Sequence, residues 1–508
     1  MARYWNGISD GLSWTGKMGL LCRHLCLCKT SAVILLASLC GCAPMRNDAK
    51  PYPEIAPEQI RLADGIRLAR DGWPSARWWT GYNDAQLNAL IEQGLAASPT
   101  MTIAKTRVAQ TRSQVEIVRA GVDLPLVLFG AIDQEHVSSK GFLGAYAGKQ
   151  PSIGADGPWY TEGIVGLGTN MNIDLFGQRR SQVDAAMGAE NARIAEVSAV
   201  ELEVATDVAQ LYFESQTTFA TIELLQQSHE VASFAVEAHR ARYARGLESE
   251  VPAQDAIAQQ LALERQIAAA RARIIQLREA LRALVGAGPD ELADIKQVAL
   301  PVVEPGLPAT LSYELLTRRP DLQALRWYVQ SSFDRIDAAK AAFYPSFNIR
   351  AFFGFNALHL EDLFNSDSKQ INITPGLSLP LFDSGRLNAN LDSARSASNV
   401  LISQYNQAVL NAIRDVARAG SRMQDLQEEV RLQERRVQAT EFSRDSASAR
   451  YERGLSNKLI AMQAHQPVIV ERLALLDLNA RRLSQDIALI KALGGGYRNE
   501  TPLTLPPR

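Results

Sequence analysis

The sequence predicts an α+β membrane protein assembled from two copies of one large module. Three observations lead to this fold class: a repeat at an offset of 208 residues, two long stretches without proline, and several segments in which apolar and polar residues alternate. An offset this large does not describe short solenoid units, so each copy is a large module of its own. We therefore expect a helical region and a sheet region, each present twice in the chain.

The repeat is clearest where ARYARGL at residues 241–247 returns as ARYERGL at residues 449–455. The same offset relates Val285-Gly286 to Leu493-Gly494, so the helices that follow keep their register. Earlier in the copies, DLFGQR at 174–179 is echoed by PLFDSGR at 380–386. We predict a first structural repeat over 84–286, a linker over 287–310, and a second structural repeat over 311–494.

Each copy is expected to contain a first helix, two strands, a very long helix and a shorter return helix. Residues 159–251 and 381–466 contain no proline. A helix of about 65 residues is about 100 Å long at 1.5 Å per residue, and its apolar residues need partner helices. The predicted ranges are 84–120 and 311–342 for the first helices, 178–244 and 386–452 for the long helices, and 252–285 and 458–493 for the return helices.

Two local signals bear on these helices. Gly246 follows the first long helix as its stop. Pro467 lies inside the second return helix, where it removes a backbone donor, and we expect a kink there.

The strand pattern decides how many chains are needed. Ile371, Ile373 and Leu377 alternate with polar or small residues, and similar alternation follows residues 165–173 and 347–355. A less regular strand is expected near 123–135. Two strands per copy make four per chain, whereas about eight is the smallest number that closes a transmembrane barrel. An open edge in lipid leaves backbone groups unpaired, so we predict a homotrimeric barrel of twelve strands that continues into an α-helical barrel.

The composition excludes one broad class of function. The chain of 508 residues has 53 Lys and Arg against 55 Asp and Glu, and its formal net charge is -2. A nucleic-acid binder needs a basic excess, so no nucleic-acid partner is expected. Hydrophobic residues make up 46% of the chain, as in a packed protein.

The N-terminal region predicts a lipid anchor. All five cysteines lie within residues 1–42, and the apolar run at 32–39 is too short to span a bilayer. It has the length of a signal-peptide core, and Leu39-Cys40-Gly41-Cys42 resembles a bacterial lipobox. We predict a signal peptide over 1–41, with Met1 or Met18 as its start, lipid attachment at Cys42, and an N-terminal anchor segment over 42–83. Ala43 favours the outer membrane, and an ordinary signal peptide is the alternative.

No residue pattern points to catalysis, so we predict that the chain is not an enzyme. The six histidines include no H-E-x-x-H pair, and the glycines at 163–168 lie within a strand rather than opening a helix. The spacing of Cys22, Cys26 and Cys28 permits metal binding, but thiolate sites need a fold to hold them. We therefore expect no metal and no cofactor.

With these segments in place, the chain resembles the TolC-like outer-membrane efflux proteins, in particular the NodT-type lipoproteins of resistance-nodulation-division (RND) pumps. The resemblance covers essentially the whole mature chain. It is carried by the lipobox at Cys42, by LTRRPDL at 316–322, by Tyr344-Pro345, by the joints at 174–177 and 381–386, by the two repeated tips, and by KALGGG at 491–496.

The resemblance implies a function and a set of partners. It implies a homotrimeric outer-membrane channel, anchored in outer-membrane lipid, with a large periplasmic extension and equatorial segments near 43–80, 287–310 and 495–508. Such a channel is the exit duct of a tripartite efflux system, and passively conducts drugs or other small toxic compounds from an inner-membrane pump of RND type and a periplasmic adaptor. The alternatives are a channel for type I protein secretion and a structural coiled-coil lipoprotein.

The resemblance also implies which residues meet the partners. Adaptors of this family dock at the helical tips, and the matching positions are Arg242, Tyr243, Arg245 and Gly246 in the first copy, and Arg450, Tyr451, Arg453 and Gly454 in the second. Many relatives carry aspartates after the second tip, in an acidic ring that closes the periplasmic end. Here those positions are Ile460 and Gln463. Asp255 lies at the matching position of the first copy, so it is a candidate gate residue together with Ile460 and Gln463, or else a solvated residue of the first helical turn.

Overall fold

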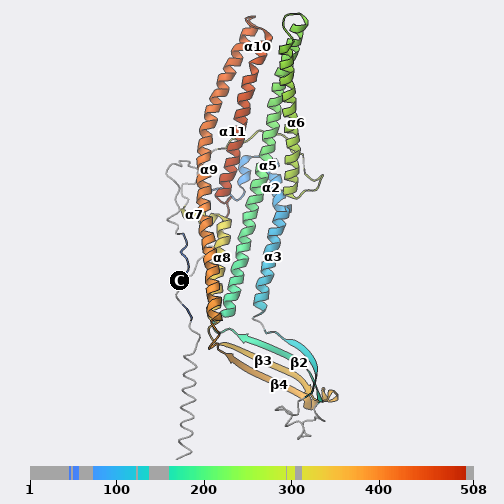
Figure 1. The fold of residues 1–508 in the computed structure, drawn as a ribbon, viewed down its shortest axis with the longest axis vertical. Coiled ribbons are helices and arrows are strands. Elements are labelled where there is room, and N and C mark those ends of the chain that lie inside the picture. Colours follow the sequence, from blue (N-terminus) through green and yellow to red (C-terminus); the bar gives the residue numbers. More distant parts are fainter. Residues whose placement is uncertain are drawn as a thin grey trace, which may run out of the picture. The chain divides into compact units, whose positions relative to one another are not determined.

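The structure is a computed structural model that describes residues 45–46, 50–55, 73–121, 124–136, 159–292, 294–303 and 312–498. The predicted signal peptide, Cys42 and the end of the predicted tail lie outside these residues. Within them the chain is mostly helical and carries one four-stranded sheet, and its two copies follow each other in the same element order (Figure 1).

The two copies have the same order of elements, except that the return helix of the first copy is matched by two helices in the second. The first contains α2 (Ala85–Ala97), α3 (Pro99–Ala120), β1 (Val127–His136), β2 (Trp159–Ile173), α5 (Gln178–Ala244) and α6 (Val251–Val285). The second contains α7 (Ser312–Arg318), α8 (Pro320–Ala341), β3 (Ser346–Ala357), β4 (Lys369–Ser378), α9 (Arg386–Glu452), α10 (Lys458–Gln463) and α11 (His465–Ala492). Short 3-10 turns are η2 (Trp78–Tyr82), η4 (Leu360–Asp362) and η5 (Ser366–Ser368). The long helices α5 and α9 both have 67 residues and run over the predicted ranges.

Three helices that the sequence predicted as continuous are divided. Ser98 has an extended ψ of 132° and separates α2 from α3, because the ring of Pro99 disfavours helical backbone at the residue before it. Arg319, which precedes Pro320, separates α7 from α8 in the same way. The second return helix is interrupted at Ala464, three residues before Pro467. Since Pro467 cannot donate to the carbonyl of Gln463, the predicted distortion is confirmed, although the helix is broken in two.

The described chain forms two compact units. One takes in residues 118–184 and 333–397 together with the described residues up to 50, and it contains the sheet. The other takes in residues 51–117, 185–332 and 398 onwards, and it contains the helical hairpins and their tips.

The sheet is an antiparallel meander in the order β1-β2-β3-β4, so β2 and β3 join the two copies. Its register pairs Phe129 with Gly166, and Gly166 with Gly354. One face carries Leu128, Ile132, Leu167, Phe353, Ile371 and Ile373, all of them exposed within the chain. Among the described strands, β1 and β4 each pair along one side, so both edges of the sheet lack a partner strand.

The largest hydrophobic core lies in the unit that contains the hairpins. It is formed by η2, α2, α5, α6 and α11, and Tyr212 is fully buried at its centre. The Tyr212 hydroxyl donates to Asp84 Oδ2 at 2.6 Å, and Asp84 Oδ1 accepts the N–H groups of Gln86 and Leu87. Asp84 therefore caps α2 and ties it to α5 at the same time.

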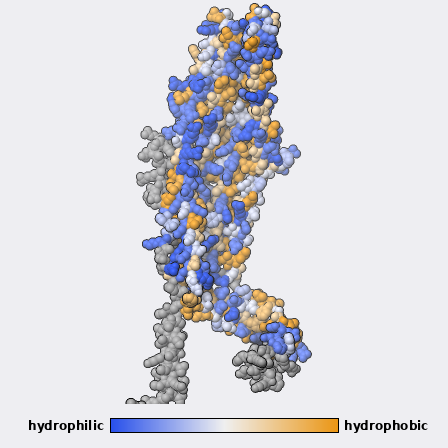
Figure 2. Space-filling view, in the orientation of Figure 1, coloured by the Kyte–Doolittle hydropathy of each residue, from blue (hydrophilic) through white to orange (hydrophobic). Residues whose placement is uncertain are grey.

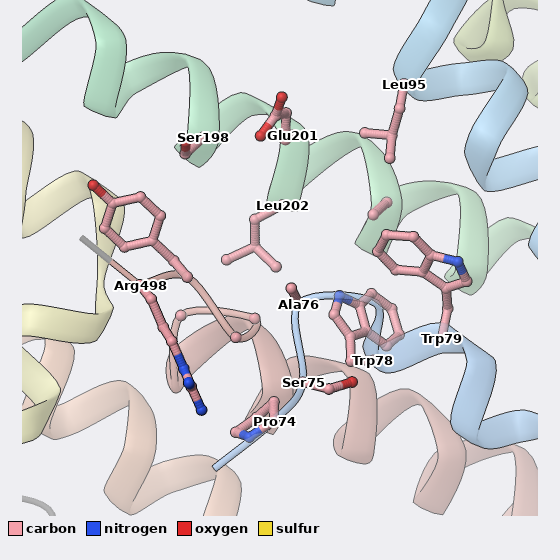
Figure 3. A pocket seen from close by; sticks show the side chains of 15 residues that line it. Pro74, Ser75, Ala76, Trp78, Trp79, Leu95, Ser198, Glu201, Leu202 and Arg498 are labelled. Atoms are coloured by element: carbon pink, nitrogen blue, oxygen red, sulfur yellow. The ribbon is translucent and has the colours of Figure 1, made fainter. Parts of the chain in front are cut away.

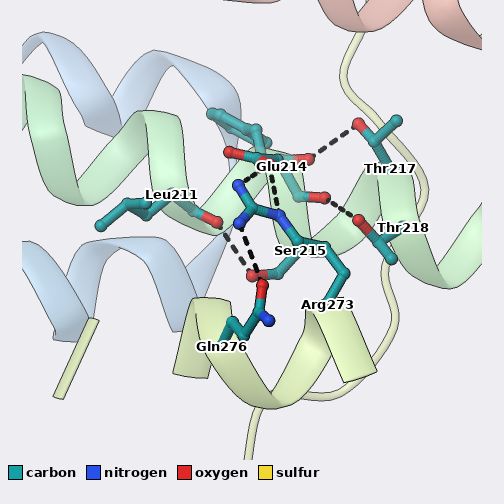
Figure 4. A network of polar contacts seen from close by, with 8 residues as sticks. Leu211, Glu214, Ser215, Thr217, Thr218, Arg273 and Gln276 are labelled. Carbon is teal, nitrogen blue, oxygen red and sulfur yellow. Dashed lines mark hydrogen bonds and ion pairs between the residues drawn. The ribbon is translucent and has the colours of Figure 1, made fainter. Parts of the chain in front are cut away.

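Polar contacts fasten α5 to α6 along the first hairpin (Figure 4). Arg273 of α6 donates through Nε to Glu214 Oε1 at 3.0 Å, and its Nη1 donates to Gln276. The hydroxyls of Ser215 and Thr218 of α5 instead donate to the backbone carbonyls of Leu211 and Glu214, one turn earlier in the same helix. In the space-filling view, apolar patches interrupt the hydrophilic surface along the helices (Figure 2). No helix in the described part of the chain has both the length and the apolar character that a membrane span needs.

Candidate functional site: the two hairpin tips

Each hairpin turns back through the same backbone motif. At the first tip the N–H of Leu247 donates to the carbonyl of Arg242 at 3.0 Å, and the N–H of Gly246 donates to the carbonyl of Tyr243 at 2.8 Å. The second tip repeats both bonds, from Leu455 to Arg450 and from Gly454 to Tyr451. Gly246 and Gly454 have φ angles of 69° and 73°. This is the Schellman arrangement, which satisfies the last carbonyls of a helix and requires a left-handed residue after it.

The structure places all eight predicted docking residues on the surface of the tips. Tyr243 and Tyr451 are 48% and 41% exposed, and Leu247 and Leu455, which the prediction did not include, are 67% and 73% exposed. In a Schellman motif the residue after the glycine usually packs back on its own helix. Here both leucines remain available to another molecule, so the tips combine apolar and basic groups.

A cluster of three ionisable side chains lies at the first tip, and the sequence did not predict it. Glu248 Oε1 accepts from His239 Nδ1 at 2.7 Å, and Glu248 Oε2 lies 2.7 Å from Arg242 Nε. The side chains of Glu248 and His239 are only 16% and 17% exposed. We refer to His239, Arg242 and Glu248 as the tip brace. It joins the last turns of α5 to the loop before α6.

The second tip is held by different contacts. The Lys458 ammonium lies 5.0 Å from the centre of the Phe234 ring, which belongs to α5. Leu459 packs on Ala235, Val236 and Ala256 of the first hairpin. The start of α10 is capped by Asn457, whose side chain accepts the N–H of Ile460. The two hairpins therefore contact each other just behind their tips.

The candidate gate residues lie on the helices that leave the tips. Asp255 is exposed on α6, Gln463 is exposed at the end of α10, and Ile460 is 52% exposed. Asp255 and Gln463 occupy equivalent positions, because they differ by the repeat offset of 208. Their role as a gate stays a prediction.

The sequence reasoning also missed an asparagine ladder on α9. Asn388 accepts the N–H of Arg46, Asn399 accepts the N–H of Tyr52, and Asn406 accepts the N–H of Ile55. These asparagines are 11 and 7 residues apart, a spacing that keeps them on one face of a helix. The backbone at Arg46, Tyr52 and Ile55 is therefore fixed to α9 shortly after the predicted anchor at Cys42.

A hollow of about 600 Å³ lies beside the largest core (Figure 3). Residues 74–79 and 494–498 form its walls, and α5 contributes Ser198, Glu201 and Leu202. Desolvation raises the pKa of the Glu201 carboxyl, an effect that Lys105 opposes.

The described histidines do not gather into a metal site. The structure contains no cluster of three or more His, Cys, Asp or Glu among the described residues that could hold an ion. His229 does have an acidic neighbour that the sequence did not reveal, since its Nε2 lies 3.1 Å from Glu264 Oε1 across the hairpin. Together with the His239 contact, this shows that the histidines of α5 fasten it to the residues that follow.

The arrangement defines a class of protein. Its chain is duplicated, each repeat forms a very long helical hairpin, and each repeat contributes two strands to one four-stranded sheet. Solved structures have the same fold. The outer membrane protein VceC from Vibrio cholerae is 32% identical, with a TM-score of 0.72 over 84% of this chain and 100% of that chain. The CmeC outer membrane channel of Campylobacter jejuni, at 18% identity, has a TM-score of 0.77 over 91% of this chain and 96% of that chain.

The chain belongs to the outer membrane efflux protein family, whose sequence profile matches residues 90–287 and 311–495. A relative in Escherichia coli K12, the multidrug resistance outer membrane protein MdtP, is 51% identical over 475 residues, which is 94% of this chain and 97% of the relative. The resemblance drawn from the motifs is thereby confirmed. The protein is an outer-membrane efflux protein and not an enzyme, which rules out a merely structural coiled-coil lipoprotein.

Proposed function

We propose that the chain is the exit duct of a tripartite efflux system. As a homotrimer, it would conduct drugs or other small toxic compounds passively from an inner-membrane pump of RND type, through a periplasmic adaptor, to the exterior. The relative MdtP is named for multidrug resistance, and this supports small toxic compounds as the cargo.

The observation that carries the proposal is the incomplete sheet. Its four strands leave two edges without a partner strand among the described residues, and one of its faces carries exposed apolar side chains. Lone edges and a bare apolar face are unfavourable in water, and the edges are unfavourable in lipid as well. Copies of the same chain, joined edge to edge, would pair both edges and place the apolar face against lipid. Three copies supply twelve strands, which is within the range of transmembrane barrels.

Apolar stripes on the helices support association of identical chains. On α9, Val400, Leu410, Leu432 and Phe442 are each about half exposed or more. At 3.6 residues per turn they fall within a sector of about 120°. On α6, Leu261 and Ile275 are 58% and 65% exposed, and α3 exposes Ile103 and Ile117. A ring of copies in which the α9 face meets the α3 and α6 faces of its neighbour would bury both stripes.

The remaining elements of the proposal concern the two ends of the duct. The tips around Arg242–Gly246 and Arg450–Gly454 would receive the adaptor. Asp255, Ile460 and Gln463 would line the periplasmic opening, where three copies of Asp255 would make a ring of carboxylates that attracts cations. At the other end, Cys42 would carry the lipid, with the equatorial segments around the middle of the assembly.

Complementation tests the proposal. An E. coli strain that lacks MdtP, and is sensitised by loss of its other outer-membrane efflux proteins, would receive the chain on a plasmid. We expect resistance to a panel of toxic compounds to rise at least about fourfold over the empty plasmid. The purified protein should run as a trimer on a gel before boiling. Absence of any rise in resistance, at normal outer-membrane levels, would refute the efflux role.

A further inference from the structure

The two tips have the same backbone but different charges at one key position. Glu248 of the first tip corresponds to Ser456 of the second, and His239 corresponds to Ala447, at the repeat offset of 208. Both copies keep the arginine in the last turn of the long helix, as Arg242 and Arg450. The helix dipole favours a cation at that place in both copies. The tip brace therefore exists in the first copy alone.

Because of this difference, Arg242 has an ion-pair partner within its own tip and Arg450 has no equivalent partner in the described part of the chain. The Arg242 guanidinium is neutralised by Glu248, which is largely shielded from solvent. The Arg450 guanidinium makes no hydrogen bond or ion pair with any described residue of the chain. Arg453 is likewise exposed and without a charged partner within the described residues, and Lys458 lies over the Phe234 ring. At the Arg450 position the second tip thus presents a positive charge that the first tip has paired internally, whereas Arg245 and Arg453 are exposed in both copies.

The first tip also offers an ordered apolar surface. Leu247 and Val251 are 67% and 64% exposed, and Tyr243 is 48% exposed. In the tip brace, one carboxylate oxygen of Glu248 contacts His239 and the other contacts Arg242. These contacts hold the loop between α5 and α6 in place. Little conformational entropy is therefore lost when a partner packs on this loop. A partner could therefore pack apolar side chains on this braced tip at little entropic cost, and make a specific charge interaction at the other tip.

We propose that the two tips are unequal docking sites for one partner protein, which places apolar side chains on the first tip and a carboxylate on Arg450 of the second. The inference rests on the proposed function, in which the tips receive a periplasmic adaptor. Glu248 is a positioning residue in this scheme, and the partner is acidic where it meets Arg450. Opposite charges across an interface mainly set orientation and partner choice, so the free arginine would fix which hairpin faces which part of the adaptor.

The internal repeat supplies a matched set of variants for the complementation strain described above. Arg450→Gln removes the free charge, whereas Arg242→Gln removes the equivalent charge that Glu248 already neutralises. Ser456→Glu puts a carboxylate at the position equivalent to Glu248, so that Arg450 becomes paired within its own chain. Outer-membrane level and trimer formation on an unboiled gel are measured for every variant, and variants that keep both are compared for resistance.

We expect Arg450→Gln and Ser456→Glu to lower resistance about fourfold or more, and Arg242→Gln to lower it by a clearly smaller factor. Starting from an Arg450→Glu strain, selection for restored resistance should yield Asp or Glu changed to Lys or Arg in a periplasmic partner. Equal losses for Arg242→Gln and Arg450→Gln, or parental resistance for Ser456→Glu, would overturn the inference. Failure of the parent chain itself to raise resistance would refute the proposed function instead.

Discussion

Replacing Gly286 with alanine should destabilise the protein far more than replacing the glycine at a tip. Gly286 ends α6 with φ 71°, and a Cβ added there would overlap the carbonyl oxygen of Ala97 and lie 3.3 Å from Pro99 Cδ. Left-handed backbone costs a residue with a Cβ about 1–2 kcal/mol. Forcing α2 and α6 apart adds about 1–3 kcal/mol, so we expect a total near 3 kcal/mol.

Gly246→Ala is the matched control, because Gly246 has nearly the same φ, 69°, with nothing within 4 Å of the added Cβ. It should cost only the backbone term of about 1–2 kcal/mol. Urea unfolding of each purified variant, followed through its helical circular dichroism, gives the change in the free energy of unfolding. Equal changes for the two variants would show that the close approach of α6 to α2 does not contribute, and would refute the packing argument.

Three further predictions follow from single groups. Asp84→Ala removes the cap of α2 and leaves the buried Tyr212 hydroxyl without its acceptor, so it should cost about 2–3 kcal/mol in the same unfolding assay, and a cost below about 1 kcal/mol would contradict the double role of Asp84. Burial and a hydrogen bond to Glu196 raise the pKa of Tyr328 to about 12, above the ordinary 10. Its contribution to stability is therefore complete below pH 10 and is lost as the pH rises towards 12. Over that pH window the unfolding midpoint of Tyr328→Phe should fall less steeply than that of the parent chain. Cys42→Ser should leave the leader uncut and the protein without lipid, as read by mass spectrometry, and normal processing would exclude the lipobox.

The long helices could be predicted to the residue because local sequence signals mark where they begin and end. The stretches without proline leave room for helices as long as α5 and α9, and a glycine follows each helix within two residues of its end. The divisions at Ser98 and Arg319 were missed although the prolines are visible in the sequence. Proline is also favoured at the first position of a helix, and Pro99 and Pro320 begin new helices with little change in pattern.

The residues of the tips could be predicted only where the same residue types occur in both copies of the repeat. The paired arginines, tyrosines and glycines of the tips stand out because they recur, and the structure places them on the surface. Glu248 and His239 do not recur, and their contact depends on how the loop folds back over nine residues. Comparing the two copies at Glu248 and Ser456 was the one signal that could have revealed it.

The asparagine ladder was beyond local reasoning for a different reason. Its hydrogen bonds join residues that are 342 to 351 positions apart. No periodic pattern in this part of the sequence indicates a partner helix. The contacts are made by the backbone N–H groups of Arg46, Tyr52 and Ile55, and these groups do not depend on the side chains. The order of the strands is a similar case, because the pairing of β2 with β3 follows from the assembly of the two copies rather than from either copy alone.

The number of chains in the purified mature protein tests the central claim most directly, since an incomplete sheet and bare helical stripes require identical partners. Native mass spectrometry from detergent should find one species with three times the mass of the mature chain. A monomer that keeps its helical content and stays soluble without detergent would contradict the account.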